Sequence, residues 1–178
     1  RGVARAVAAR QEGTGGDVGG TRSDRQGCVH TTRRERALSA ASQAGRVELE
    51  RGHKYLGLPM NIQPRFFPYD GKLAALVIIA AGNTGKDMQL ALAFMRGCWA
   101  EEKNMADETE VVAAIRAAGL DSDALLKQAN APDTARQFDA FTDEAIARQV
   151  FGAPTYVYRD ELFWGQDRLE FLDRALEK

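Results

Sequence analysis

The sequence predicts an α/β protein in which a run of helices precedes two short strands and a final helix. In the middle of the chain, apolar residues recur at helical spacing between glycines and capping residues. Near the end, two β-branched and aromatic stretches lie on either side of a two-residue turn, in VFGAPTYVYRDELFWGQDRL at residues 150–169. Residues 1–45 follow neither pattern and can supply little of a core.

The composition of residues 1–45 differs from that of the remainder. This segment holds eight Arg, four acidic residues, eight Gly and eight Ala, but no aromatic residue. We expect it to be atypical and largely irregular. Its glycine cluster, 13–20, lacks the Gly-Lys-Ser/Thr of a phosphate loop, and Cys28 with His30 has no second pair of metal ligands.

Three interpretations of this segment stay open. It could be a flexible glycine-rich linker, or an organellar targeting peptide, which its four acidic residues disfavour. It could also be a GC-rich gene read in a shifted frame, with the native frame beginning near Arg46. The gene sequence upstream tests the last interpretation, which fails if no alternative frame encodes a strand-helix-strand unit.

The overall composition limits the classes of function. With 178 residues, 44% of them hydrophobic, the chain is long enough for one domain with a core. The net charge of −1 gives no indication of nucleic-acid binding, and no segment has the ~20 apolar residues of a membrane span. Cys28 and Cys98 form no Cys-x-x-Cys pair, and two histidines offer little for a metal. We therefore expect a cytoplasmic protein without a metal, nucleic-acid or membrane partner.

A series of helices is expected from residue 47 on, interrupted by a proline-bounded loop at 61–70. The helices are predicted at about 47–56, 72–81, 86–102, 107–118, 121–130 and 133–149. The acidic side chains expected to cap three of them are Asp107, Asp121 and Asp133. The helix at 86–102 should be buried, because one side carries the apolar residues Leu90, Phe94, Met95, Cys98 and Trp99.

The C-terminal segment is predicted to form a hairpin and a helix. The strands are expected at 155–158 and 161–164, with Arg159 and Asp160 in the turn. Asp167, followed three residues later by Glu170, is expected to cap the final helix. One face of that helix carries Leu169, Leu172, Ala175 and Leu176.

This order, with Pro154 just before the first strand, is that of the second half of a thioredoxin-like domain. The C-terminal motif, together with ELERGHKYLGLPMNIQPRFFP and CWAEEKNMAD, resembles the 2-hydroxychromene-2-carboxylate isomerases. These enzymes are relatives of the kappa-class glutathione transferases and of bacterial disulfide-bond oxidoreductases. The resemblance covers about residues 46–178. It implies a thioredoxin-like fold with an inserted all-helical subdomain at 46–149. Residues 150–178 would supply the C-terminal β-hairpin and helix of this fold, and the first βαβ unit of the fold is missing or degenerate.

The resemblance implies a glutathione site near the strands. The backbone N–H and C=O of Ala153, before a cis Pro154, would pair with the cysteinyl part of the ligand. Gln166 and Asp167 would contact its γ-glutamyl end, with the carboxylate facing the ammonium group. The residues alone leave two simpler alternatives open, a plain turn at Ala153-Pro154 and a helix cap at Asp167.

A second site, for the other substrate, is implied by the same resemblance. Arg65, Phe67, Trp99 and Asn104 lie where relatives line this pocket, and Arg65 could pair with the carboxylate of an aromatic keto acid. The alternatives are a solvated Arg65 and a Trp99 that packs in the core. Cys98, on an apolar helix face, is expected to be buried and inert.

The implied function is glutathione-dependent isomerisation of a 2-hydroxychromene-2-carboxylate in the catabolism of aromatic compounds. The thiolate would add to a conjugated double bond, the resulting single bond would rotate, and the thiolate would leave. Members of the family activate the thiol with the serine of a Ser-Pro motif, which this sequence lacks. The catalytic residue is therefore unassigned, whether the chain is an enzyme stays open, and weak or no activity is expected.

Two other functions stay open. One is a kappa-like glutathione transferase that acts on an electrophile. The other is a non-catalytic remnant whose exposed sheet edge binds a partner or forms a homodimer.

Overall fold

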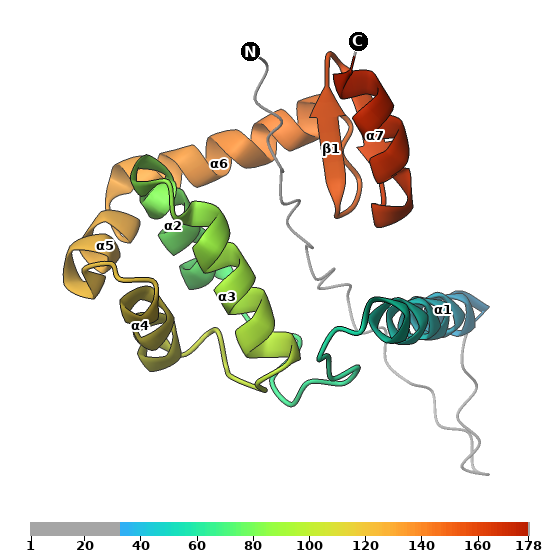
Figure 1. Cartoon of the computed structure of the whole chain (residues 1–178), viewed down its shortest axis with the longest axis horizontal. Helices are drawn as coiled ribbons and strands as arrows, with labels where there is room; N and C mark the ends of the chain where they lie inside the picture. The colour runs from blue at the N-terminus through green and yellow to red at the C-terminus, as the bar shows by residue number, and fades with distance from the viewer. Residues whose placement is uncertain (1–32, 178) are drawn as a thin grey trace, which may run out of the picture.

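The computed structural model describes residues 33–177, with side chains described from residue 43 on. In this part of the chain, six helices in succession precede two strands and a last helix. The elements are α1 (Arg33–Leu56), α2 (Lys72–Ala81), η1 (Gly82–Thr84), α3 (Asp87–Trp99), α4 (Glu108–Ala117), α5 (Ser122–Ala129), α6 (Pro132–Ala147), β1 (Thr155–Tyr158), β2 (Glu161–Trp164), η2 (Gln166–Arg168) and α7 (Leu169–Leu176). Figure 1 shows α2 to α5 gathered in one helical group, from which α6 runs to the unit formed by β1, β2 and α7.

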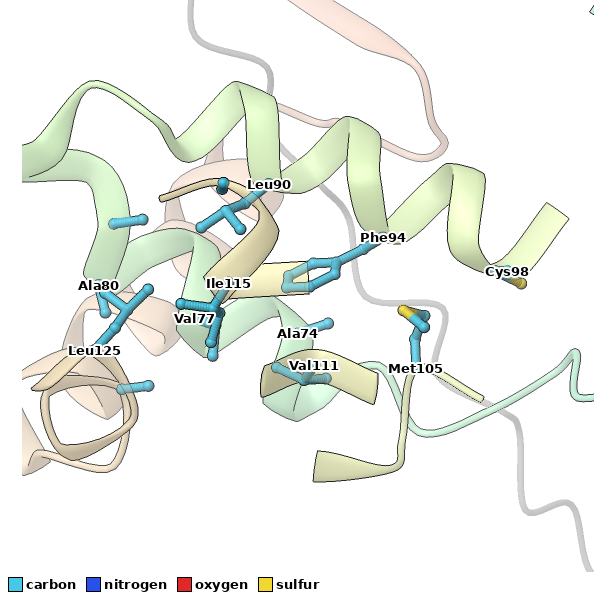
Figure 2. Close-up of a cluster of buried hydrophobic side chains, with 13 residues drawn as sticks. Ala74, Val77, Ala80, Leu90, Phe94, Cys98, Met105, Val111, Ile115 and Leu125 are labelled. Atoms are coloured by element: carbon cyan, nitrogen blue, oxygen red, sulfur yellow. The ribbon is translucent and has the colours of Figure 1, made fainter. Parts of the chain in front are cut away.

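Helix α2 lies at the centre of the helical group. Its sequence after Lys72 is entirely apolar, and a helix that is hydrophobic on all sides is stable in water only when other elements surround it. It packs against α3, α5 and α6. Figure 2 shows the resulting core, whose buried residues are Ala74, Val77, Ala80, Ala81, Leu90, Phe94, Cys98, Met105, Val111, Ile115, Ala118, Leu125 and Ala129.

The helix caps agree with the sequence at two of the three predicted positions before the strands. The Asp107 carboxylate accepts the N–H of Thr109 at the start of α4. The Asp121 carboxylate accepts two backbone N–H groups at the start of α5. The prediction for Asp133 was wrong, because Pro132 begins α6 and the N-cap residue, Ala131, has no side chain that could accept a hydrogen bond.

Helix α3 is buried on one side only, which corrects the prediction for Met95. Leu90, Phe94 and Cys98 are buried, as predicted, where α3 faces α2 and α4. Met95 is 52% exposed, because it continues the i, i+4, i+7 series of Met88 and Leu92 on the opposite face, where both are also exposed.

Helix α1 begins at Arg33, within the segment expected to be irregular. That expectation therefore does not hold for residues 33–45, and the helix runs across the predicted boundary at 45 and 46. These residues are rich in Ala, Arg, Glu and Leu, which favour a helix even without an apolar stripe. The glycine cluster, Cys28 and His30 lie outside the described residues.

The boundaries predicted for the two later parts stay predictions. Helices α2 to α6 fall within residues 46–149, and both strands with α7 fall within 150–178. No strand precedes β1 in the described part of the chain, so a first βαβ unit is not among residues 33–154. No helix between residues 33 and 177 is long and apolar enough to cross a membrane.

The predicted β-hairpin is confirmed residue for residue. β1 and β2 pair antiparallel, with Thr155 opposite Trp164 and Tyr158 opposite Glu161. Both turn residues, Arg159 and Asp160, have positive φ angles of 49° and 64°, as a two-residue hairpin turn of type I′ requires. The strands β1 and β2 and the helix α7 each contain one buried side chain, which are Thr155, Phe163 and Leu172, and α7 packs against both strands.

Gly165 joins β2 to η2 in a conformation that only glycine adopts readily. Its φ and ψ are 101° and 151°. A Cβ atom at this position would press against Oδ1 of Asp167.

We predict that Gly165→Ala lowers the free energy of unfolding by about 1–3 kcal/mol, because the new methyl group meets both the backbone strain and Asp167. Urea denaturation followed by circular dichroism measures this change. The matched control is Gly82→Ala, since Gly82 has helical φ and ψ and open space around the added Cβ. Equal stability of the two variants would contradict this account of Gly165.

Candidate functional site

The open end of the hairpin brings the four predicted glutathione-site residues together. The Ala153–Pro154 bond is cis, as the resemblance implied, and both residues are exposed. The C=O of Pro154 accepts a hydrogen bond from the N–H of Gly165 at 2.9 Å. This bond holds Ala153 and Pro154 beside the start of η2, which contains Gln166 and Asp167.

The backbone of Ala153 is available to a ligand. Among the hydrogen bonds of residues 33–177, none involves its N–H or its C=O. The neighbouring backbone is held in place by protein contacts, since Thr155 Oγ1 donates to the C=O of Gly152 and the Trp164 indole lies against Gly152. The free N–H and C=O of Ala153 therefore lie on a fixed loop.

Asp167 does not cap the final helix, which corrects the prediction from the sequence. The chain first makes the short turn η2, and α7 begins at Leu169 with Arg168 at its N-cap and no side-chain cap. The Asp167 carboxylate instead pairs with Nη1 of Arg168 at 2.7 Å. Both side chains are more than half exposed, so the pair presents one negative and one positive group to solvent.

The predicted residues of the second site lie around the C-terminal end of α3. The rings of Phe67 and Trp99 are 4.8 Å apart, and Tyr69 meets Phe67 edge-on with 6.5 Å between centroids. Trp99 is half-buried and packs against the core, so the core alternative also holds for part of its surface.

Glu102 holds the loop at 61–70 in place. Its carboxylate accepts hydrogen bonds from Nδ2 of Asn61 at 2.6 Å and from the N–H of Arg65 at 3.3 Å. The N–H of Asn61 donates to the C=O of Trp99 at 2.6 Å. The loop that carries Phe67 is therefore fixed to the end of α3.

Arg65 contacts its neighbour Phe66, and Asn104 lies in the turn before α4. The Arg65 guanidinium is exposed and lies over the ring of Phe66, 5.2 Å from its centroid. Asn104 shapes the turn into α4, because its Oδ1 accepts the N–H of Ala106 and its C=O accepts the N–H of Asp107. The structure thus brings Phe67 and Trp99 into contact and assigns Asn104 a role in the turn.

The two groups of residues occupy different places in the fold. Figure 1 shows the start of α7 at the end of the hairpin unit away from the C-terminus, and the C-terminal end of α3 below and to the left of it. We call them two half-sites. The polar half-site consists of Ala153, Pro154, Gln166 and Asp167, and the aromatic half-site contains the ring pair of Phe67 and Trp99.

Two contributors to these half-sites were not found from the sequence. Arg168 is the ion-pair partner of Asp167, and its position next to Asp167 was the available signal. Glu102, with a positive φ of 52°, joins the loop to α3 across 41 positions of sequence, and no local pattern indicates this contact.

Several ionisable groups near α3 have altered pKa values. Burial raises the pKa of the Cys98 thiol, and burial together with Cys98 raises the pKa of Tyr69. Hydrogen bonds from Lys103 and Arg96 lower the pKa of the Glu101 carboxyl. Among the side chains of residues 43–177, no group of three or more His, Cys, Asp or Glu could hold a metal ion.

The hairpin, its preceding cis-proline and the helical group define a thioredoxin-fold protein with a helical insertion. Residues 28–177 match the family described as the DSBA-like thioredoxin domain. The chain belongs to this family. The match begins earlier than the resemblance at about residue 46, and it includes the whole of α1.

Curated relatives are named 2-hydroxychromene-2-carboxylate isomerase. The protein of Sphingobium xenophagum is 31% identical over 130 residues, which are 73% of this chain and 65% of the relative. The protein of Pseudomonas putida is 27% identical over 135 residues, 74% of this chain and 63% of the relative. The chain therefore spans slightly less than two thirds of the length of these relatives.

A solved structure of a 2-hydroxychromene-2-carboxylate isomerase has the same fold. Its TM-score is 0.69 at 24% identity, and the match covers 84% of this chain and 71% of the other. The thioredoxin-like fold with a helical insertion is thus confirmed.

We predict that Cys98 in the folded protein is alkylated at least about tenfold more slowly than in urea at pH 8. Cys98 is 1% exposed, so iodoacetamide has little access to its sulfur in the folded protein, and the raised pKa also disfavours the thiolate, which is the form that reacts. Because the pKa of Cys98 is higher in the folded than in the unfolded chain, its contribution to the free energy of unfolding is fully present below the unfolded pKa. This contribution is lost as the pH rises from the unfolded pKa through the folded pKa. Iodoacetamide labelling with peptide mass spectrometry measures the rate at Cys98, and equal rates in both states would contradict the prediction.

Proposed function

We propose that this chain is the ligand-binding part of a glutathione-dependent isomerase acting on a 2-hydroxychromene-2-carboxylate. The observation that supports it most is the free backbone of Ala153, held by the Pro154–Gly165 hydrogen bond next to the exposed Asp167 carboxylate. The names of the two relatives at 31% and 27% identity give the substrate class. A role in the catabolism of aromatic compounds follows from that class of substrate.

The residues of the hairpin end fit a small peptide ligand. An extended peptide pairs with a strand through one N–H and one C=O at each contact, and Ala153 offers both groups. Pro154 has no N–H, so the pairing ends there and the strand hydrogen bonds of β1 are left to the hairpin. We therefore assign Ala153 and Pro154 to the cysteinyl part of glutathione.

The charges at η2 fit the other end of the same ligand. The γ-glutamyl end of glutathione carries an ammonium group and a carboxylate on one carbon. Asp167 and Arg168 present the opposite charges 2.7 Å apart, and both are exposed. Asp167 would face the ammonium, Arg168 the carboxylate, and Gln166 would supply a hydrogen bond to the same end.

The aromatic half-site fits the second substrate. Phe67 and Trp99 form a ring pair that can stack with an aromatic keto acid, and Arg65 can pair with its carboxylate. Asn104 supports this half-site by holding the chain between α3 and α4.

The reaction needs a thiol nucleophile, which bound glutathione would supply. The protein's part is to orient the thiol and stabilise its thiolate by a hydrogen-bond donor at the sulfur. The chain contains no Ser-Pro motif to provide this donor. We therefore propose binding of both ligands by this chain and slow isomerisation at most.

Isothermal titration calorimetry with glutathione tests the proposal. We predict saturable binding, weakened about tenfold, or about 1.4 kcal/mol, in Asp167→Ala through loss of the ion pair with the ammonium. Asp173→Ala is the matched control, because Asp173 is an exposed carboxylate on α7 away from its start. Absence of binding by the parent chain, or equal weakening by both substitutions, would contradict the proposed site.

Isothermal titration calorimetry with 2-hydroxychromene-2-carboxylate tests ligand binding at the aromatic half-site. Arg65→Gln removes the charge that would pair with the carboxylate and should weaken this binding while leaving glutathione binding unchanged. Arg136→Gln is the control, since Arg136 is exposed on α6. Unchanged affinity in Arg65→Gln would remove Arg65 from the site.

A further inference from the structure

Glu102 lies just after α3 in a backbone conformation that costs free energy. Its φ angle of 52° is in the left-handed region, which residues with a Cβ atom seldom adopt. The preceding carboxylate, Glu101, forms ion pairs with Arg96 and Lys103. Glu102 forms no ion pair among the side chains of residues 43–177 and instead bonds to the loop at 61–70. These bonds to the loop offset the strain.

Residues 64–67 form a closed turn that carries Phe67. The N–H of Phe67 donates to the C=O of Pro64 at 3.2 Å, which is the hydrogen bond of a β-turn. Arg65 follows Pro64 in this turn, and its N–H donates to the Glu102 carboxylate. Because the turn is closed, a bond to one of its residues also restrains the others. Glu102 therefore helps to determine where the Phe67 ring lies.

Few apolar contacts hold this loop in place. Among residues 61–70 only Pro64 is buried, and Phe67 is 46% exposed. Figure 1 shows the loop as part of the connection between α1 and α2, where it passes the C-terminal end of α3. A segment that buries so little apolar surface has low local stability, so its polar links to α3 are needed to keep it ordered.

The same arrangement leaves the charge of Arg65 available. The guanidinium lies over the Phe66 ring, and the ion pairs of residues 43–177 do not include it. Glu102 accepts the backbone N–H of Arg65 and the side-chain amide of Asn61. Its carboxylate is thus occupied by N–H donors and does not neutralise the guanidinium, which stays free for the carboxylate of a ligand.

We propose that Glu102 is a positioning residue of the aromatic half-site, an inference that rests on the proposed binding of an aromatic keto acid there. Glu102 acts without touching the ligand. It holds the turn at 64–67 so that the Phe67 ring lies on Trp99 before the ligand arrives. Side chains that are already ordered lose less entropy on binding, so this link raises the affinity for a flat aromatic ring with one carboxylate.

Acrylamide quenching of Trp99 fluorescence tests the positioning without a ligand. The chain has two tryptophans, so Trp164→Phe is the background in which Trp99 is the only one. Glu102→Gly should increase the quenching about twofold, because the half-buried Trp99 ring loses the cover of Phe67. Glu102→Gln should leave it unchanged, because the amide oxygen still accepts both hydrogen bonds.

Two controls separate this effect from a loss of folding. Glycine adopts a positive φ without strain, so Glu102→Gly removes the link to the loop without forcing the backbone. Its thermal unfolding midpoint, followed by circular dichroism, should stay close to that of the parent. Glu101→Gly is the matched control, since Glu101 is the adjacent carboxylate and pairs with Arg96 and Lys103 instead of the loop.

Isothermal titration calorimetry with 2-hydroxychromene-2-carboxylate, in the chain that keeps Trp164, tests whether the positioning affects the ligand. Glu102→Gly should weaken binding about tenfold, whereas Glu102→Gln should bind at least as tightly as the parent chain. Loss of the negative charge alone would favour an anionic ligand in both variants. The difference between the two variants therefore measures position and not charge.

An exchange of donor and acceptor tests the direct contact. Asn61→Asp places two carboxylates where Asn61 now donates to Glu102, and it should weaken binding as much as Glu102→Gly. The double variant Asn61→Asp/Glu102→Gln should restore the affinity, because the new amide can donate to the new carboxylate and still accept the N–H of Arg65.

Unchanged quenching in Glu102→Gly, an equal effect of Glu101→Gly, or no rescue by the double variant would overturn the inference. So would unchanged affinity in Glu102→Gly when its Trp99 has become accessible to acrylamide. A parent chain that binds no 2-hydroxychromene-2-carboxylate would contradict the proposed function instead. The quenching alone would then decide whether Glu102 holds Phe67 on Trp99.

Discussion

The hydrogen bond between Gly165 N–H and Pro154 C=O, 2.9 Å long, determines the geometry of the C-terminal unit. It closes the open end of the hairpin, so the loop before β1 and the turn after β2 lie side by side. The proposed ligand groups come from these two segments, and neither segment would position them alone.

The helical group carries the aromatic half-site and is linked to this unit by α6. Helix α2 is apolar on all sides and is enclosed by α3, α5 and α6, which fixes the C-terminal end of α3. Glu102 then attaches the loop at 61–70 to that end, so Phe67 meets Trp99. Helix α6 runs from the helical group to the hairpin unit (Figure 1).

Features that depend on neighbouring residues were predictable from the sequence, whereas those that depend on distant contacts were not. The hairpin, the limits of α2 and the caps at Asp107 and Asp121 follow from local turn, periodicity and capping chemistry. Asp167 was predicted as a cap because an acidic residue three positions before Glu170 is typical of a helix start. The chain instead forms the short turn η2 after Gly165, and the Asp167 carboxylate pairs with Arg168. Glu102 was missed because its partners lie far away in the sequence. The family's fold is confirmed, while the roles of Ala153, Gln166 and Asp167 stay predictions.

The central claim is that the end of the hairpin opposite its turn, where Gly165 bonds to Pro154, binds a peptide ligand through the backbone of Ala153. Amide chemical shifts of ¹⁵N-labelled protein during a glutathione titration test this claim most directly. The account predicts saturable shifts at Ala153 and at Gly165 to Arg168, with the amides of α4 and α5 unchanged. Shifts confined to other parts of the chain, or none at ligand concentrations up to about 10 mM, would contradict it.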